Sequence, residues 1–174
     1  LFQHKTSDPL GAGVPGATWS TGGALNLGRS GLGGAGIQTA SLAFGGTTSG
    51  SSGDRTTATE GYDGTSWSSR PSLGTARRLG GGAGLNTAAI YHGGYTTTDI
   101  SLTEEFSSSL SATTAAAWSS IANFPDSRAY SAASGGTPTS TLVFGGYTGS
   151  GLGGFVSSGA EFNGSSWTAT GDYV

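Results

Sequence analysis

The sequence predicts an all-β fold built from three similar units, each made of four short antiparallel strands. Three observations favour this: tryptophans at regular spacing, a set of landmarks that recurs between them, and Gly-rich turn signals between short apolar runs. Glycine occurs 34 times in 174 residues, and with serine and threonine it makes up close to half of the chain. Such compositions often indicate disorder. With 34% hydrophobic residues and aromatics at fixed intervals, an ordered repeat is the better interpretation.

Tryptophans, arginines and glycine pairs define the repeat. The four tryptophans are 48, 51 and 49 residues apart, and lie at Trp19, Trp67, Trp118 and Trp167. Ten residues after each of the first three comes an arginine: Arg29, Arg77 and Arg128. Sixteen or seventeen residues after each arginine comes a glycine pair: Gly45-Gly46, Gly93-Gly94 and Gly145-Gly146. A period near 50 residues indicates a repeat architecture.

The first half of each unit predicts a pair of strands. The first strand is a segment of small residues, expected at residues 31–36, 80–84 and 129–134. A short turn is expected next, at residues 37–38, 85–86 and 137–138. The second strand is the apolar run that ends at the glycine pair, where an unusual φ and close neighbouring backbone favour glycine.

The second half of each unit predicts two further strands after a variable polar loop. The third strand carries an acidic residue and an aromatic one: Glu60 and Tyr62, Glu104-Glu105 and Phe106, or Glu161 and Phe162. The fourth strand lies at the tryptophan. Between them, Asp63-Gly64 and Asn163-Gly164 predict tight two-residue turns, because both turn positions need a positive φ. In the second unit, residues 111–117 resemble an insertion.

These landmarks divide the chain into five parts. We expect a partial repeat or outer strand at residues 1–19, three complete units at residues 20–67, 68–118 and 119–167, and a C-terminal tail at residues 168–174.

Charge and residue composition exclude several functions. Seven basic residues against ten acidic ones do not provide the basic surface that nucleic-acid binding needs. No apolar run approaches the roughly 20 residues that cross a membrane. The absence of cysteine excludes a disulfide frame, a thiolate nucleophile and a zinc ribbon, and two histidines are little material for a metal centre. We therefore expect no cofactor, no metal and no membrane insertion.

The order arginine, apolar run, glycine pair, acidic-aromatic element and tryptophan resembles the kelch motif, over residues 29–167. Kelch repeats of about 50 residues form the blades of a β-propeller. The resemblance implies three kelch-type blades of four antiparallel strands, plus an extra N-terminal strand. The short segments at residues 60–67 (EGYDGTSW) and 142–147 (LVFGGY) also resemble sequences of kelch-like proteins of marine bacteriophages.

Three blades do not close a ring, since propellers typically have four to eight. Three arrangements remain open: a segment of a longer polypeptide, a second copy that completes a six-bladed ring, or stacking on other subunits of an assembly. We expect an incomplete ring or part of a larger assembly, with other virion proteins or copies of the chain as partners.

The repeated residues have structural roles in this interpretation. We expect the tryptophans and third-strand aromatics to pack between adjacent blades. The three arginines are expected to bond to carbonyls of the next blade, although three copies facing one channel would also form an anion site. Residues 31–36 (GLGGAG) satisfy a dinucleotide-binding pattern, but a turn and a strand follow instead of the helix that the pattern needs.

Six residues are candidates for ligand binding, and none for catalysis. Tyr95 and Tyr147 directly follow glycine pairs and are expected to stack on sugar rings. His92 takes a position that Phe44 and Phe144 hold in the other units, so it is either packed or lines a pore. The remaining candidates are Arg29, Arg77 and Arg128. Adjacent Glu104 and Glu105 point to opposite faces of a strand and cannot readily act as an acid–base pair.

The resemblance and the variable loops at residues 47–59, 95–103 and 147–159 imply a non-enzymatic recognition module, because loops on a rigid scaffold commonly carry binding. We expect a bacteriophage virion component, such as a tail fibre, receptor-binding or decoration protein, that binds a host surface glycan outside the cell. The alternatives are a secreted or cell-surface carbohydrate-binding propeller and a protein-interaction adaptor. A propeller enzyme is the weakest alternative, since few residues suit catalysis.

Overall fold

A computed structural model describes residues 19–49, 53–108, 117–149 and 154–172. These residues form three four-stranded antiparallel sheets and contain no helix. The first sheet contains β1 (Gly33–Ile37), β2 (Ala40–Phe44), β3 (Thr59–Tyr62) and β4 (Trp67–Arg70). The second contains β5 (Gly81–Leu85), β6 (Ala88–His92), β7 (Thr103–Ser107) and β8 (Ala117–Ser120). The third contains β9 (Ala132–Thr137), β10 (Ser140–Phe144), β11 (Gly159–Phe162) and β12 (Trp167–Thr170).

Each sheet pairs its strands in chain order, so the prediction of an all-β chain with three four-stranded antiparallel units is confirmed. The expected partial repeat at residues 1–19 lies outside the described residues except for Trp19, and so does most of the expected insertion at residues 111–117.

The turn between the first two strands lies one residue later than expected. Ile37 still pairs with Ala40, so the turn contains Gln38 and Thr39. The third unit has one more residue between its arginine and glycine pair, and the extra residue is accommodated as an irregularity of register between β9 and β10. A β-bulge of this kind absorbs an inserted residue without ending the sheet.

The predicted two-residue turn between the third and fourth strands is wrong. Tyr62 pairs with Trp67, so four residues connect β3 to β4. Asp63 Oδ1 accepts hydrogen bonds from the N–H groups of Thr65 and Ser66, both at 2.8 Å. Asn163 Oδ1 accepts the equivalent bonds in the third unit. The side chain therefore organises this connection, because Asp and Asn can imitate a backbone turn.

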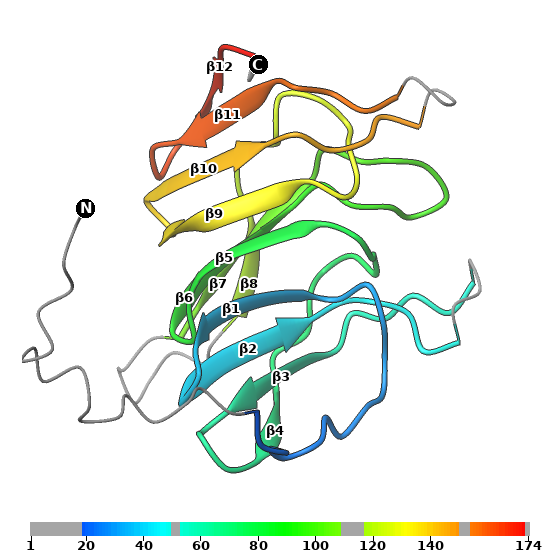
Figure 1. The fold of residues 1–174 in the computed structure, drawn as a ribbon, viewed down its shortest axis with the longest axis vertical. Helices are drawn as coiled ribbons and strands as arrows, with labels where there is room; N and C mark the ends of the chain where they lie inside the picture. The colour runs from blue at the N-terminus through cyan, green and yellow to red at the C-terminus, as the bar shows by residue number, and fades with distance from the viewer. Residues whose placement is uncertain (1–18, 50–52, 109–116, 150–153, 173–174) are drawn as a thin grey trace, which may run out of the picture.

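The hydrophobic core lies between neighbouring sheets. Figure 1 shows the three sheets following one another in chain order along the long axis, with β5 between β1 and β9. At the first junction, the Phe44 ring lies 5.0 Å from Tyr91 and 5.1 Å from Trp118 of the second sheet. At the second junction, Ala83 and Ile90 pack against Phe162, with Trp167 partly buried beside them. Burial of aromatic and aliphatic side chains between the facing sheets is thus what joins them.

The four tryptophans have three different environments. Trp118 and Trp167 reach across junctions to the preceding sheet. Trp67 instead lies 5.0 Å from Tyr62 of its own sheet, and its Nε1 donates to the carbonyl oxygen of Gly23 at 3.0 Å. The prediction that Trp19 packs between units is wrong, because its side chain is fully exposed.

The glycine pairs mark the points where the backbones of adjacent units meet. Gly45 and Gly46 both have a positive φ, of 65° and 98°. The Gly46 N–H donates to the carbonyl oxygen of Arg77 at 2.9 Å, and a Cβ on Gly45 would lie 2.7 Å from the same oxygen. A residue with a side chain would therefore be strained here twice, by φ and by contact.

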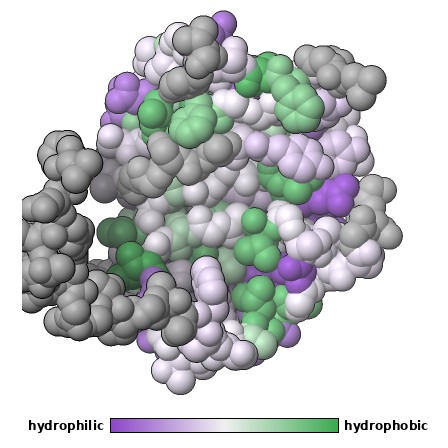
Figure 2. Space-filling model, viewed as in Figure 1, coloured by the Kyte–Doolittle hydropathy of each residue, from purple (hydrophilic) through white to green (hydrophobic). Residues whose placement is uncertain are grey.

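The surface reflects the composition. Figure 2 shows mostly pale side chains of intermediate hydropathy, with separate hydrophobic patches between them. No helix in the described part of the chain is long and apolar enough to cross a membrane.

Candidate functional site

The candidate site is a pocket of about 620 Å³ at the junction of the second and third sheets. It lies where second strands end and first strands begin, beside the loops that follow the glycine pairs. Both predicted ligand-binding tyrosines line it, together with three residues that the sequence did not single out: Tyr95, Tyr147, Arg78, Asp99 and Tyr130. These residues, which lie up to 69 positions apart in the chain, thus line one pocket.

Short backbone pairings hold the two predicted tyrosines in place. Tyr95 pairs with Arg78, and the Tyr95 N–H donates to the Arg78 carbonyl oxygen at 2.8 Å. Tyr147 pairs in the same way with Ala129, through two hydrogen bonds of 2.8 Å. Both tyrosines follow a glycine pair, and both partners come directly after a repeated arginine. The repeat therefore places equivalent residues of two units on one pocket.

Aromatic rings form one side of the pocket. The Tyr130 and Tyr147 rings lie 6.4 Å apart at 79°, and the Phe155 ring lies 5.3 Å from Tyr147. Tyr130 is 63% exposed and has a positive φ of 54°, a left-handed conformation that residues other than glycine seldom adopt. An exposed ring held in this way offers an apolar face beside a hydroxyl group.

Charged groups supply the polar part of the lining. The Arg78 guanidinium lies over the Tyr95 ring at 5.5 Å from its centroid. Burial raises the pKa of the Asp99 carboxyl above its ordinary value. Gly149 permits the approach of Asp99, because a Cβ on Gly149 would lie 2.8 Å from Asp99 Oδ2. The pocket thus combines aromatic faces with the guanidinium donors of Arg78 and the carboxylate acceptor of Asp99, which suits a ligand rich in hydroxyl groups.

The pocket offers one carboxylate, Asp99, among its lining residues. Glycoside hydrolysis ordinarily uses two carboxyl groups flanking the bond. In the described residues, no three His, Cys, Asp or Glu side chains gather closely enough to hold a metal ion.

The repeated arginines lie in the interior and not in the pocket. The Arg29 and Arg77 side chains are fully buried and form ion pairs with Glu60 and Glu104. Arg29 Nη2 donates to the carbonyl oxygen of Ala43 at 3.0 Å, in its own sheet. The expected bonds to the next unit are therefore wrong for these side chains, and their neutralised, buried charges argue against an anion site.

Glu60 shows how such a pair is held. Burial alone would raise the pKa of its carboxyl group, but hydrogen bonds from the Asn26 and Leu27 N–H groups, with the Arg29 side chain, lower it below the usual value. The carboxylate thus ties the segment before the first sheet to β3. Equivalent N–H groups, of Gly74 and Thr75, donate to Glu104 in the second unit.

The third unit builds its arginine site differently. The position of Glu60 and Glu104 is taken by Ala160, which pairs with Val143 as Glu60 pairs with Ala43. The neighbouring Glu161 is exposed and lies away from the arginine. Arg128 instead pairs with Asp126 and donates through Nη1 to the carbonyl oxygens of Gly145 and Ser158, at 2.9 and 3.0 Å.

His92 is part of the core. It is fully buried, stacks on Phe124 at 5.3 Å between ring centroids, and meets Trp167 at 5.4 Å. Burial lowers the pKa of His92 to about 3, and the charges of Arg77 and Arg128 act in the same direction. A neutral imidazole with no solvent-facing surface argues against the ligand-binding role predicted for it.

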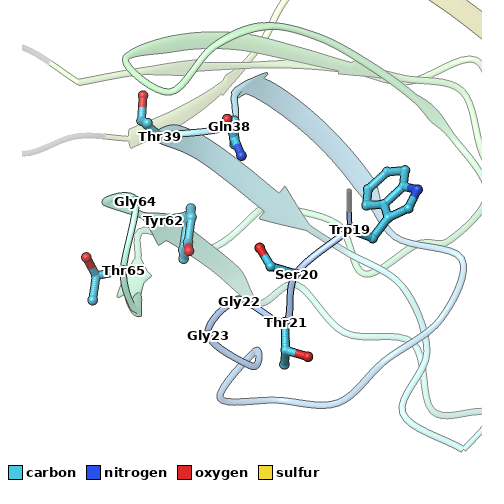
Figure 3. Close-up of a pocket in the computed structure, with 10 residues that line it drawn as sticks. All are labelled: Trp19, Ser20, Thr21, Gly22, Gly23, Gln38, Thr39, Tyr62, Gly64 and Thr65. Atoms are coloured by element: carbon cyan, nitrogen blue, oxygen red, sulfur yellow. The ribbon is translucent and has the colours of Figure 1, made fainter. Parts of the chain in front are cut away.

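A second hollow, of about 850 Å³, lies on the first sheet (Figure 3). Glycines and small polar residues contribute most of its lining, and Trp19 and Tyr62 contribute the aromatic rings. In Figure 3 the Trp19 ring lies far from Tyr62, on the other side of the hollow. Because no two rings converge among the described residues that line it, this hollow is a weaker candidate for ligand binding.

Tyr130, Arg78 and Asp99 were not identified from the sequence, because the residue type at each of these positions differs between the units. Tyr130 follows Arg128 by two residues, where the other units have Gly31 and Leu79. Gly31, Leu79 and Tyr130 all have a positive φ. A large residue at a position that favours glycine was therefore the available signal for Tyr130.

Comparison with known proteins gives the fold and little else. No family model matches the chain, and no curated protein matches it. The chain is similar to a solved structure described as the structure of YjhT, with a TM-score of 0.62 and 16% identity. The likeness covers 85% of this chain and 47% of that one, so this chain spans about half of its length. At this identity the likeness shows a shared all-β fold.

Proposed function

We propose that the chain forms three blades of a kelch-type β-propeller and serves as a non-enzymatic recognition module that binds a saccharide between its second and third sheets. The propeller arrangement is supported by three four-stranded sheets packed face to face, with the first strands adjacent at both junctions. Such radial repetition of four-stranded sheets characterises propellers.

The observation that carries the saccharide proposal is the convergence of Tyr95 and Tyr147, from equivalent positions of two units, on one pocket with Arg78 and Asp99. The apolar face of a sugar packs on an aromatic ring, while its hydroxyl groups both donate and accept hydrogen bonds. Tyr130 presents such a ring at the rim, since it is 63% exposed. Arg78 supplies donors and Asp99 an acceptor, as a polyhydroxylated ligand requires.

We propose further that the protein acts on the outside of a bacteriophage virion, where the saccharide is a host surface glycan. The support is the similarity of short sequence segments to kelch-like proteins of marine bacteriophages, together with a composition rich in glycine, serine and threonine and a surface mostly of intermediate hydropathy (Figure 2). A pocket formed by variable loops on a rigid scaffold suits the recognition of changing host glycans.

The test is a glycan array probed with the chain and with two pocket variants, Tyr130→Ala and Tyr147→Ala. We expect saturable binding to a saccharide, weakened by about fivefold in each variant, because a lost aromatic contact costs on the order of 1 kcal/mol. Trp19→Ala is the matched control, because it removes an exposed aromatic side chain outside the pocket. Absence of saccharide binding, or equal binding by all variants, would overturn the proposal.

A further inference from the structure

We propose that two copies of this chain join head to tail into a closed ring of six sheets. The third sheet of each copy would pack on the first sheet of the other. This inference rests on the propeller arrangement proposed above but is independent of the saccharide pocket, which lies within one copy.

The two junctions inside the chain share one set of backbone hydrogen bonds. At each junction, three bonds link equivalent positions of successive units, with lengths between 2.8 and 3.0 Å. At the first junction the N–H groups of Gly46, Leu73 and Leu79 donate to the carbonyl oxygens of Arg77, Thr57 and Gly31. At the second junction the N–H groups of Gly94, Phe124 and Tyr130 donate to the carbonyl oxygens of Arg128, Ser101 and Leu79. The junction is therefore a repeated joint with a fixed donor–acceptor pattern.

The outer flanks of the chain carry the two halves of the same pattern. Just before the first sheet, the equivalent groups are the N–H groups of Leu25 and Gly31 and the carbonyl group of Arg29. On the third sheet they are the N–H group of Gly146 and the carbonyls of Tyr130 and Ser157. Within the described residues, none of these six groups has a hydrogen-bond partner in the chain. Each donor on one flank thus has its acceptor on the other.

The side chains of the two flanks are also complementary, with aromatic rings on the first sheet that match an exposed ring on the third. Phe44 and His92 are fully buried by the sheets that follow them, whereas the equivalent Phe144 is 37% exposed. Phe106, which is covered by the preceding sheet, corresponds on the first sheet to Tyr62, which is only partly buried. Tyr62 and Trp67 are therefore placed to cover Phe144 of another copy, as Phe106 and Trp118 cover the Phe44 junction.

The glycine pairs show the same difference between the two junctions and the outer flank of the third sheet. A Cβ on Gly45 or Gly93 would lie 2.7 Å from a carbonyl oxygen of the following sheet. For a Cβ built on Gly145, the nearest atom among those described is the Val156 carbonyl oxygen, at 3.7 Å. Gly145 nevertheless has a φ of 65°, close to the 65° and 60° of its two counterparts. The third sheet thus keeps the shape of a junction that the Arg29 carbonyl of a second copy would complete.

A second copy of this chain satisfies this complementarity at both flanks. The two flanks differ from each other and match each other, so the contact is head to tail, and such contacts form closed rings when the rotation permits. Two copies give six sheets, within the four to eight that propellers typically contain. The YjhT chain, of which the present chain covers 47%, has about the length that two such copies would have.

Residues 19–23 lie beside Tyr62 on this flank. Gly23 accepts the Trp67 Nε1 hydrogen bond at 3.0 Å, and the hollow of Figure 3 lies beside Tyr62 on the same flank. Trp19 is fully exposed and does not anchor the segment to the sheet.

The experiment is native mass spectrometry of the full chain, with light scattering over a range of concentrations. One chain weighs 17.0 kDa, and we expect a species of twice that mass that does not grow further with concentration. A monomer at all concentrations, as expected if further sheets of a longer polypeptide cover the flanks, would overturn the proposal. An open series of larger oligomers would also overturn it, since the ring would not close.

Flank variants test the direction of the contact. Phe144→Asp and Tyr62→Asp each place a charge at both joints of the ring, and each variant alone is expected to be monomeric. Mixed together, they form a pair with one intact joint, so we expect a heterodimer to return. Leu85→Asp is the control, because Leu85 is an exposed residue of the middle sheet, and it should remain dimeric. Circular dichroism checks the fold of each variant, and dimers that persist in both, or folded variants that do not combine, would contradict the head-to-tail ring.

Discussion

Because His92 is buried as a neutral imidazole, we predict that the protein loses stability in mildly acidic solution. The imidazole is fully buried between Phe124 and Trp167, with Arg77 and Arg128 adding positive charge nearby. Its pKa falls from the unfolded value of 6.5 to about 3, so the folded state holds the neutral ring where the unfolded state takes up a proton. Stability is therefore full above about pH 6.5 and falls as the pH drops toward 3.

The size of the effect follows from the proton that only the unfolded chain binds. Each pH unit below the unfolded pKa costs up to about 1.4 kcal/mol, so lowering the pH from about 7.5 to about 5 should cost about 2 kcal/mol. This figure depends little on the folded pKa as long as it lies well below 5. The comparison stops at about pH 5 because Glu60, whose pKa is lowered, begins to lose its own contribution below its ordinary value of 4.5.

The variant His92→Phe isolates this effect. Phenylalanine occupies the same position in the other two units, as Phe44 and Phe144, so the substitution keeps an aromatic ring in the core. It also removes two buried ring nitrogens that have no hydrogen-bond partner, and we expect the variant to be at least as stable as the parent near pH 7.5.

The assay is urea unfolding of both proteins at several pH values and one protein concentration, followed by tryptophan fluorescence. We expect the parent to lose about 2 kcal/mol relative to His92→Phe between about pH 7.5 and 5. Parallel pH profiles would refute the reasoning, because they would mean that His92 titrates equally in the folded and unfolded chains.

Two further substitutions test the packing of the units. Glu104→Ala leaves the buried Arg77 guanidinium without its carboxylate and should cost about 3 kcal/mol in urea unfolding, whereas Glu105→Ala, on the less buried face of β7, should change stability by less than about 0.5 kcal/mol. Equal effects would contradict the placement of the ion pair. Gly93→Ala should cost more than the roughly 1–2 kcal/mol of the left-handed conformation alone, because its Cβ would lie 2.7 Å from the Arg128 carbonyl oxygen. The control Gly145→Ala, measured at a concentration where the chain is monomeric, carries only the conformational cost, and equal losses would place no backbone near Gly93.

The periodic features of the sequence predicted the fold well, because they record contacts that every unit repeats. The spacing of Trp67, Trp118 and Trp167 gave the fourth strands, and each apolar run before a glycine pair gave a second strand. Turn geometry was harder to predict. Asp63-Gly64 suits a two-residue turn, but the side-chain hydrogen bonds of Asp63 select a four-residue connection instead.

The site was predicted in part, for a physical reason. Tyr95 and Tyr147 were identifiable because they follow a repeated landmark, and both line the pocket. Arg78 and Asp99 pair with Tyr95 within the second unit, and the packing of the third sheet on the second brings Tyr130 and Tyr147 to the same pocket. His92 and the repeated arginines attracted attention as polar residues, yet burial among rings and carboxylates makes them part of the interior.

The most direct test of the account is an NMR titration of the chain with a saccharide that binds on the array. The claim is that two neighbouring units build one pocket, so the backbone amides of Tyr95 and Tyr147 should shift together and saturate with the same affinity. The Trp67 amide, on the first sheet, should stay unchanged. Shifts confined to one of the two tyrosines, or centred on the first sheet, would contradict a shared pocket between the second and third sheets.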